Sequence, residues 1–260
     1  MLTIKDIYSY IDKIAPFSLQ ESYDNSGLII GNENYGVTKA LIALDVTEDI
    51  AWEAVKADME LIITHHPIIF KALKRINTET PLGVLLANDV SVISAHTSFD
   101  GAVMNNILCE KLGFTPEEPL AVENGVPIGY ICNTSEGYSP KELAEIIKNA
   151  LGNSVIRYND FAEDDGRVDK KINRIAVCSG SGGSFLSEVT AKNCDAFITG
   201  DVKHDVFIDG HNAGIRIYDA GHFHTENIFC EYMQKKLSEK FPEAEFTVAE
   251  NNRDILKYVF

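Results

Sequence analysis

The chain has 260 residues, with 23 lysines and arginines against 39 aspartates and glutamates, and its formal net charge is −16 with neutral histidines. A charge of this sign repels nucleic acids and anionic lipids, so a general role in coating DNA or acidic membranes is disfavoured. Hydrophobic residues make up 45% of the sequence. They can fill the core of one large α/β domain or of two smaller ones, which excludes disorder as the main state.

The sequence also indicates the cellular compartment in which we expect the protein. No apolar run approaches the roughly 20 residues that a membrane-spanning helix needs. The N-terminal segment MLTIKDIYSYIDK is amphipathic, whereas a signal peptide is first basic and then apolar. The five cysteines are widely scattered and include no CxxC pair, which is typical of reduced thiols. We therefore expect a cytoplasmic protein without a membrane partner.

Strands and helices alternate in the first part of the chain. An amphipathic helix is predicted between Thr3, a candidate N-cap, and Pro16. After a loop that carries Asp24-Asn25-Ser26-Gly27, apolar runs alternate with helical patterns, which is typical of a mostly parallel sheet covered by helices. The predicted strands are residues 40–44, 61–64 and 90–95, and the predicted helices are residues 47–57 and 101–112.

A proline- and glutamate-rich stretch, residues 115–125, is the best candidate for a domain junction. We therefore expect two α/β halves, residues 1–120 and residues 121–260, with the last helix and strand able to pack back on the first half. A charge-rich segment, residues 160–171, is interpreted as a solvated loop. The predicted strands of the second half are residues 127–132, 172–178, 196–199 and 215–218, and its predicted helices are residues 140–151, 185–191 and 222–240.

Three short motifs recur in the same order in the two halves. IALD at 42–45 resembles IAVC at 175–178, LIITHH at 61–66 resembles FITGDV at 197–202, and VSVISAH at 90–96 resembles IRIYDAGH at 215–222. We interpret these matches as a diverged internal duplication. The predicted fold class is therefore α/β, with two similar three-layer halves and a metal site between them.

Histidines and carboxylates follow the predicted strands. His65 and His66 end one strand, and adjacent residues of an extended backbone point in opposite directions, so each can serve one of two neighbouring ions. His96 and His222 end the corresponding strands of the two halves, and each precedes a carboxylate by four residues, Asp100 and Glu226.

If residue 222 begins a helix, His222 and Glu226 share one face of it, and His224 points elsewhere. Such mixed imidazole and carboxylate ligands suit zinc, iron, manganese or nickel, and a carboxylate can bridge two ions. In the alternative interpretation, each histidine only caps an element or satisfies a local hydrogen bond.

Several of these motifs together resemble the GTP cyclohydrolase I type 2 family, also called the NIF-three-like dinuclear-metal proteins. They are HHP after a strand, AHTSFD, TGDVKH and GHFHTE, and the match runs from DNSGL to the final helix. The resemblance implies two divalent metal ions per chain and a homohexamer. It implies that His66 and Asp100 bind one ion, that His65 and His222 bind the other, and that Glu226 bridges them. The residues that would support the ions or face the substrate are His96, His204, His224, Asp24, Asp45 and Asp201.

The resemblance also implies a reaction. Two ions about 3.5–4 Å apart can hold a bridging hydroxide, which would attack a purine nucleotide such as GTP or a related cyclic amide. Glu226 would take part in catalysis, and His96 or His224 is a candidate donor of the proton that the departing nitrogen needs. Positive charge for a triphosphate could come from Lys203 and from the segment that follows HHP, which carries Lys71, Lys74 and Arg75. That segment could equally be an ordinary exposed helix face.

Two further functional classes stay open. The chain could be a metal-storage or metal-delivery protein that binds ions without turnover. It could also be an oligomeric ring that acts as an interaction scaffold, although the acidic charge argues against a ring that threads DNA.

Overall fold

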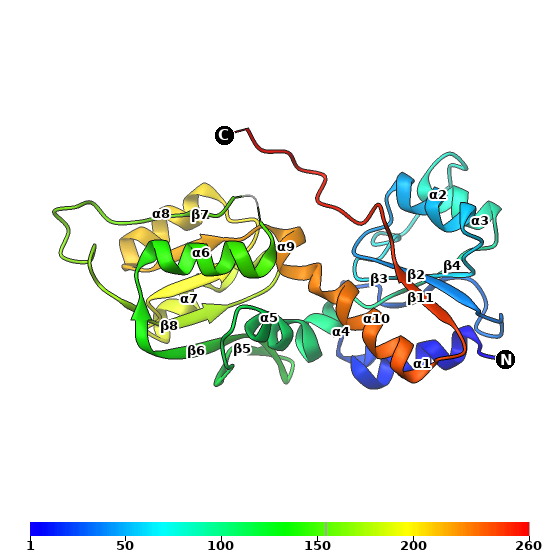
Figure 1. Ribbon diagram of the computed structural model, residues 1–260, viewed down its shortest axis with the longest axis horizontal. Helices are drawn as coiled ribbons and strands as arrows, with labels where there is room; N and C mark the ends of the chain where they lie inside the picture. The colour runs from blue at the N-terminus through cyan, green and yellow to red at the C-terminus, as the bar shows by residue number, and fades with distance from the viewer. Residues whose placement is uncertain (154, 260) are drawn as a thin grey trace. The chain divides into compact units, whose positions relative to one another are not determined.

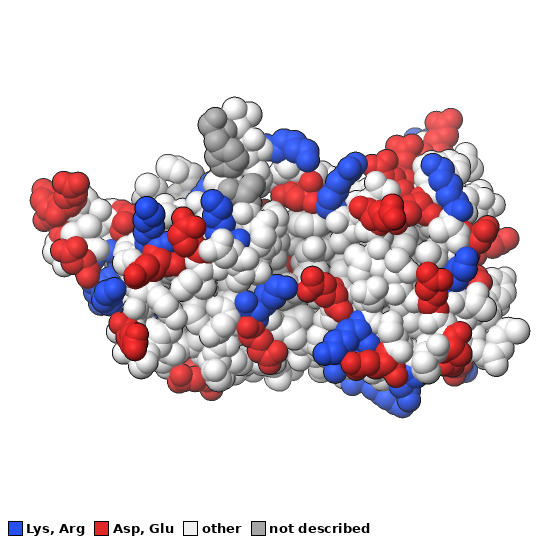
Figure 2. All heavy atoms as spheres, in the orientation of Figure 1, with Lys and Arg blue, Asp and Glu red and all other residues white. Residues whose placement is uncertain are grey.

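The computed structural model describes residues 1–153 and 155–259, which form two compact α/β units (Figure 1). Unit 1 comprises residues 1–102 and 229–253, and unit 2 comprises residues 103–228 together with the segment from Asp254 onward. Figure 2 shows acidic side chains spread over the visible face of each unit, as the net charge of −16 leads one to expect. Among the described residues, no helix is both long enough and apolar enough to cross a membrane.

The sheet of unit 1 has five strands in the order β1-β4-β3-β2-β11. Four of them are parallel, and β1 is antiparallel to β4. Every residue of β3 and β4 is buried, which is typical of strands covered on both faces. The strands are β1 (Gly27–Ile30), β2 (Lys39–Ala43), β3 (Leu61–Thr64), β4 (Ser91–Ser94) and β11 (Glu245–Val248).

Helices cover both faces of this sheet. Leu41, Ile62 and Val92 lie side by side on neighbouring strands and pack in one apolar cluster with α2 and α3. The other face is covered by α1 and α10 (Figure 1). The helical elements are α1 (Ile4–Ile14), η1 (Phe17–Leu19), α2 (Glu48–Lys56), α3 (Pro81–Ala87), α4 (Thr97–Phe99) and α10 (Ile228–Lys240), and the π-helical turn η2 (Asp100–Met104) follows α4.

The sheet of unit 2 has six strands in the order β5-β6-β8-β9-β10-β7. Its three central strands β8, β9 and β10 are parallel, and the flanking pairs are antiparallel. The strands are β5 (Glu118–Glu123), β6 (Val126–Tyr138), β7 (Arg157–Tyr158), β8 (Ile172–Val177), β9 (Ala196–Thr199) and β10 (Arg216–Asp219).

Unit 2 also has three layers. Successive residues of a strand point to opposite faces, and in β10 Ile217 joins the apolar cluster of α7 and α8 while the hydroxyl of Tyr218 donates to the carbonyl of Pro140 at the start of α6. The helical elements are α5 (Asn105–Lys111), α6 (Pro140–Leu151), η3 (Gly182–Phe185), α7 (Leu186–Ala191), α8 (His204–Ala213) and α9 (His222–Glu226). The predicted fold class, two α/β units with helices on both sides of each sheet, is confirmed.

The two sheets share an arrangement of four strands. In unit 1, β2, β3 and β4 are parallel neighbours, and the antiparallel strand β1 pairs with β4. In unit 2, β8, β9 and β10 are parallel neighbours, and the antiparallel strand β7 pairs with β10. This common topology supports the internal duplication that the three recurring motifs predict.

Some elements differ from the sequence-based expectation. The predicted last helix is two helices, because α9 ends at Glu226 and α10 begins at Ile228. The stretch 115–125 forms an antiparallel hairpin of β5 and β6, in which Asn124 and Gly125 both have positive φ. Asn-Gly is the favoured pair for such a two-residue turn. This pair and the alternating apolar residues on either side of it, and not the prolines of the stretch, decide that the stretch forms a hairpin. Helices α3 and α8 were not predicted.

The charge-rich segment 160–171 is a loop, as predicted, and the buried Arg216 of β10 holds it. The Arg216 guanidinium donates to the carbonyls of Arg167 and Val168 at 2.8 and 2.9 Å and to the Asp160 carboxylate at 2.9 Å. It also lies over the Phe161 ring, 4.6 Å from the ring centroid.

We predict that Arg216→Leu lowers the free energy of unfolding by about 3 kcal/mol, because two loop carbonyls and a carboxylate lose their buried donor. Urea titration followed by circular dichroism measures this. The control is Arg253→Leu, since Arg253 makes an exposed ion pair with Asp49 and should contribute less than about 1 kcal/mol. Equal losses of unfolding free energy in the two variants would contradict the role of Arg216 in holding the loop.

Candidate metal centre

Three histidines of unit 1 lie at the carboxyl ends of two neighbouring parallel strands. His65 and His66 follow β3, and His96 follows β4. One ring nitrogen of each lies within 4.8 Å of the corresponding nitrogens of the other two. The carboxyl ends of parallel strands meet at one edge of a sheet, which is where open α/β sheets place functional groups.

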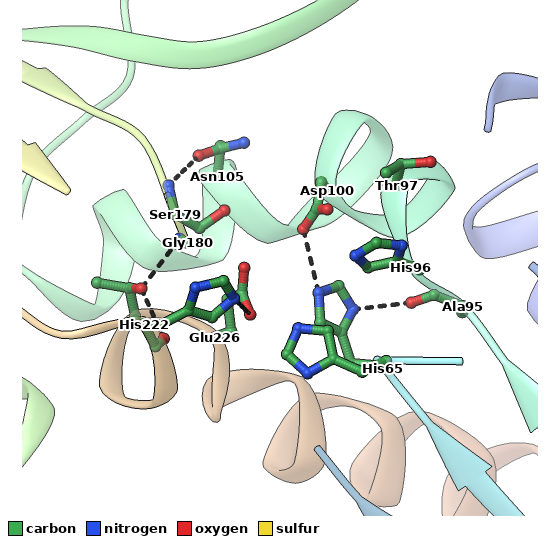
Figure 3. Close-up of polar contacts among 12 residues, drawn as sticks. His65, Ala95, His96, Thr97, Asp100, Asn105, Ser179, Gly180, His222 and Glu226 are labelled. Atoms are coloured by element: carbon green, nitrogen blue, oxygen red, sulfur yellow. Dashed lines mark hydrogen bonds and ion pairs between the residues drawn. The ribbon is translucent and has the colours of Figure 1, made fainter. Parts of the chain in front are cut away.

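Each of these rings is held through Nδ1 by an oxygen atom. Nδ1 of His65 lies 2.8 Å from the carbonyl of Ala95 (Figure 3), and Nδ1 of His66 lies 2.8 Å from the Asp45 carboxylate. Nδ1 of His96 lies 2.7 Å from the Asp24 carboxylate. Because a carbonyl or carboxylate oxygen can only accept, Nδ1 carries the proton in each ring. The neutral imidazole then has its lone pair on Nε2, the arrangement found in histidines that bind metals.

Asp24 explains the role of the DNSG segment in unit 1. Its side chain is fully buried, and its carboxylate accepts hydrogen bonds from the Thr97 hydroxyl at 2.6 Å and the Ser26 hydroxyl at 2.8 Å in addition to His96. Burial raises the pKa of this carboxyl, but the hydrogen bonds from His96, Thr97 and Ser26 outweigh burial and hold the pKa well below its usual range. Asp24 therefore stays ionised and fixes the orientation of His96.

Asp100 begins the π-helical turn η2, an irregularity that is frequent at functional sites. Its Oδ1 lies 3.4 Å from Nε2 of His65 (Figure 3). The family resemblance pairs Asp100 with His66, whereas unit 1 places its carboxylate beside His65. A carboxylate oxygen and an imidazole lone pair repel each other, so this pair suits a cation that both atoms can bind.

Unit 2 contains a second histidine–carboxylate pair on α9, which begins at the predicted residue. Nε2 of His222 lies 2.9 Å from Oε2 of Glu226 (Figure 3), because residues four apart share one face of a helix. Nδ1 of His222 lies 2.8 Å from the Asp201 carboxylate. This ring therefore resembles that of His65, with Nδ1 held by an oxygen and Nε2 facing a carboxylate.

Glycines make room for this pair. At Gly200, a Cβ atom would lie only 2.8 Å from the backbone nitrogen of His222, so glycine lets the turn that carries Asp201 approach the start of α9. At Gly180, a Cβ atom would lie 2.2 Å from Oε1 of Glu226, and the φ of +60° also favours glycine.

The loop that carries Gly180 is fixed by two side chains that the sequence analysis missed. The backbone nitrogen of Gly180 donates to the Thr225 hydroxyl at 3.0 Å, and that of Ser179 donates to the Asn105 side chain at 2.9 Å (Figure 3). The sequence signal for this loop is the glycine cluster 180–183.

The remaining histidines lie elsewhere. Nε2 of His224 is 3.4 Å from the Asp254 carboxylate, so His224 points away from the pair on α9, as predicted. His204 is exposed at the first residue of α8. The ring of His211 lies 5.2 Å from that of Phe161. Within residues 1–153 and 155–259, no candidate metal group includes any of these three histidines or a cysteine.

The described residues thus provide buried or half-buried groups of histidines and carboxylates that could hold metal ions. Their donors are imidazole nitrogens and carboxylate oxygens, a set that suits zinc, iron, manganese or nickel. The carboxylates and the carbonyl on the opposite ring nitrogens fix the orientation of the imidazoles.

Comparison with known proteins places the chain in a family. A Clostridium perfringens protein named GTP cyclohydrolase 1 type 2 homolog is 33% identical over 270 aligned residues, which cover 99% of this chain and 100% of that protein. A Helicobacter pylori GTP cyclohydrolase 1 type 2 is 34% identical over 88% of this chain and 89% of its own length. The solved structure of a Staphylococcus aureus hypothetical protein matches with a TM-score of 0.90 at 24% identity, over 99% of each chain, and therefore shares the fold. Residues 2–254 match the Duf34/NIF3 (NGG1p interacting factor 3) family model, and the chain belongs to this family.

Proposed function

We propose that this chain is a dinuclear metal-dependent hydrolase that acts on a purine nucleotide or a related cyclic amide. The observation that carries the proposal is the shared state of four histidine rings, in which an acceptor oxygen holds Nδ1 and leaves Nε2 as the nitrogen that would act. That nitrogen would bind a cation in His65, His66 and His222 and a proton in His96. The name GTP cyclohydrolase 1 type 2 of the relatives supports the substrate class. The proposed metal ligands are His65, His66, Asp100, His222 and Glu226.

The contact between Asp100 and His65 decides how we divide these ligands. We propose that His65 and Asp100 would hold one ion, that His66 and His222 would hold the other, and that Glu226 would contribute to both. This assignment keeps the five residues that the family resemblance implies and exchanges the two adjacent histidines. When bound, divalent ions would supply Lewis-acid chemistry, since they lower the pKa of water and polarise the bond that is attacked.

His96 is the proposed proton carrier. Hydrolysis of a ring C–N bond requires a base for the proton of the attacking water and an acid for the departing nitrogen. Nε2 of His96 can accept that proton and return it to the nitrogen, while the Asp24 carboxylate stabilises the imidazolium that forms in between. His224 is the weaker candidate, because its Nε2 lies against Asp254.

We also propose a cytoplasmic homo-oligomer, a hexamer by the family resemblance. The five cysteines are free thiols and all are buried, which supports a reducing compartment. Sedimentation equilibrium tests the oligomer, and a mass equal to that of one chain would contradict it.

We predict that Glu226→Gln and His65→Ala each lower hydrolysis at least about 100-fold without unfolding the protein, because each removes a metal ligand. The measurement is a product screen over purine nucleotides and cyclic amides with metal-loaded protein. The matched control is His204→Ala, which removes an exposed histidine outside the candidate groups and should leave turnover unchanged.

Hydrolysis by chelator-treated, metal-free protein would contradict the proposal. Two bound ions per chain with no product from any substrate would instead favour a metal-storage or metal-delivery protein.

We predict that Gly180→Ala weakens Zn²⁺ binding at least about tenfold, because the added methyl group displaces the Glu226 carboxylate and strains a backbone of positive φ. Competition with a chromogenic chelator measures the affinity. The control is Gly183→Ala in the same glycine cluster, where a Cβ atom would make only ordinary contacts with Val206 at 3.6 Å. Equal affinity of the two variants would show that Glu226 does not depend on Gly180.

A further inference from the structure

The segment that follows the ligand histidines of unit 1 is an exposed loop with an unusual composition. Every residue from 70 to 79 is exposed. The loop nevertheless presents large apolar side chains, since Phe70, Leu73 and Ile76 are 43%, 52% and 51% exposed. We refer to residues 67–79 as the ligand-proximal loop.

Phe70 connects this loop to the candidate metal centre. Its ring centroid lies 5.9 Å from that of His96, with the two ring planes at 82°. On its other side, the Tyr23 ring lies 6.3 Å away, and this ring is 64% exposed. One exposed aromatic ring, that of Phe70, therefore adjoins the histidine that we assign to proton transfer, and a second, that of Tyr23, adjoins Phe70.

Both ends of the ligand-proximal loop are anchored. The side chain of Asn25 donates to the carbonyl of Ile69 at 2.6 Å. At the far end, the Thr80 hydroxyl donates to the carbonyl of Asn77 at 2.7 Å, and Gly83 of α3 lies so close to this turn that a Cβ atom would approach the Asn77 carbonyl oxygen to 2.3 Å. The fold thus fixes the loop beside His96.

The loop also concentrates positive charge in an acidic chain. Lys71, Lys74 and Arg75 lie within five residues, and no carboxylate occurs between positions 67 and 78, although the chain carries a net charge of −16. Within the part of the chain that the structure describes, none of the three forms an ion pair. The segment is not the exposed helix face that the sequence left open, because no helix occurs between β3 and α3.

We infer that the ligand-proximal loop binds the substrate as a nucleoside phosphate. The Phe70 ring stacks against the base, since every purine has a π face that aromatic side chains can cover, and the Tyr23 ring, at 65° to that of Phe70, contacts the base edge-on. The three basic side chains bind the phosphate groups through charge-assisted hydrogen bonds. This inference rests on the proposed function and narrows its substrate class from cyclic amides in general to nucleotides.

The experiment compares the binding of GTP and of uncharged guanosine to metal-loaded protein by calorimetry. We expect the triple variant Lys71→Gln, Lys74→Gln, Arg75→Gln to weaken GTP binding at least about tenfold and guanosine binding less than about twofold, because guanosine has no phosphate. Phe70→Leu keeps an apolar side chain and should weaken both ligands about fivefold or more, because stacking is lost.

The matched control removes the same three charges elsewhere, by Lys13→Gln, Lys56→Gln, Lys141→Gln, all at exposed positions. It should change GTP affinity less than about twofold. The inference is overturned if wild-type protein does not bind GTP, or if the loop triple and the control triple have equal effects. Loop-dependent GTP binding without any hydrolysis would support the inference and contradict the proposed hydrolase. Hydrolysis that the loop variants leave unchanged would support the hydrolase and contradict the inference.

Discussion

The candidate site depends on one kind of hydrogen bond, from Nδ1 of a histidine to an oxygen that can only accept. Asp45 holds His66, and Asp201 holds His222. In each case a carboxylate after one parallel strand fixes a histidine after the neighbouring strand, β2 and β3 in unit 1 and β9 and β10 in unit 2. This hydrogen bond fixes the ring orientation and makes Nε2 the nitrogen that would meet an ion. Ligand chemistry and proton transfer by His96 both follow from it.

The surrounding fold supports this bond with close backbone approaches and buried polar groups. Gly200 and Gly180 allow backbone to pass next to His222 and Glu226, where any side chain would collide. In unit 1, the carboxylate of Asp24 is buried at the cost of desolvation, and hydrogen bonds from Thr97 and Ser26 offset that cost. Such features add nothing to a hydrophobic core, and we interpret them as requirements of the site.

Much of the fold was predictable from local patterns. Thr3 caps the first helix, and β3 and β9 have the predicted bounds, because capping residues and buried apolar runs act locally. The hairpin at Asn124-Gly125 was not predicted, because its prolines and glutamates are also typical of a linker. Sequence spacing predicted that His222 and Glu226 share a helical face. It could not reveal that Asp100 lies beside His65 or that Gly180 adjoins Glu226, because both contacts join residues distant in the chain.

The central claim concerns which nitrogen of each histidine meets the ion. Crystals of metal-loaded protein, with anomalous diffraction recorded on both sides of the absorption edge of the metal, test it most directly. The account predicts two anomalous peaks per chain, at bonding distance from Nε2 of His65, His66 and His222, with Nδ1 of each ring still on its oxygen partner. A single peak, or coordination through Nδ1 after these hydrogen bonds have broken, would contradict it.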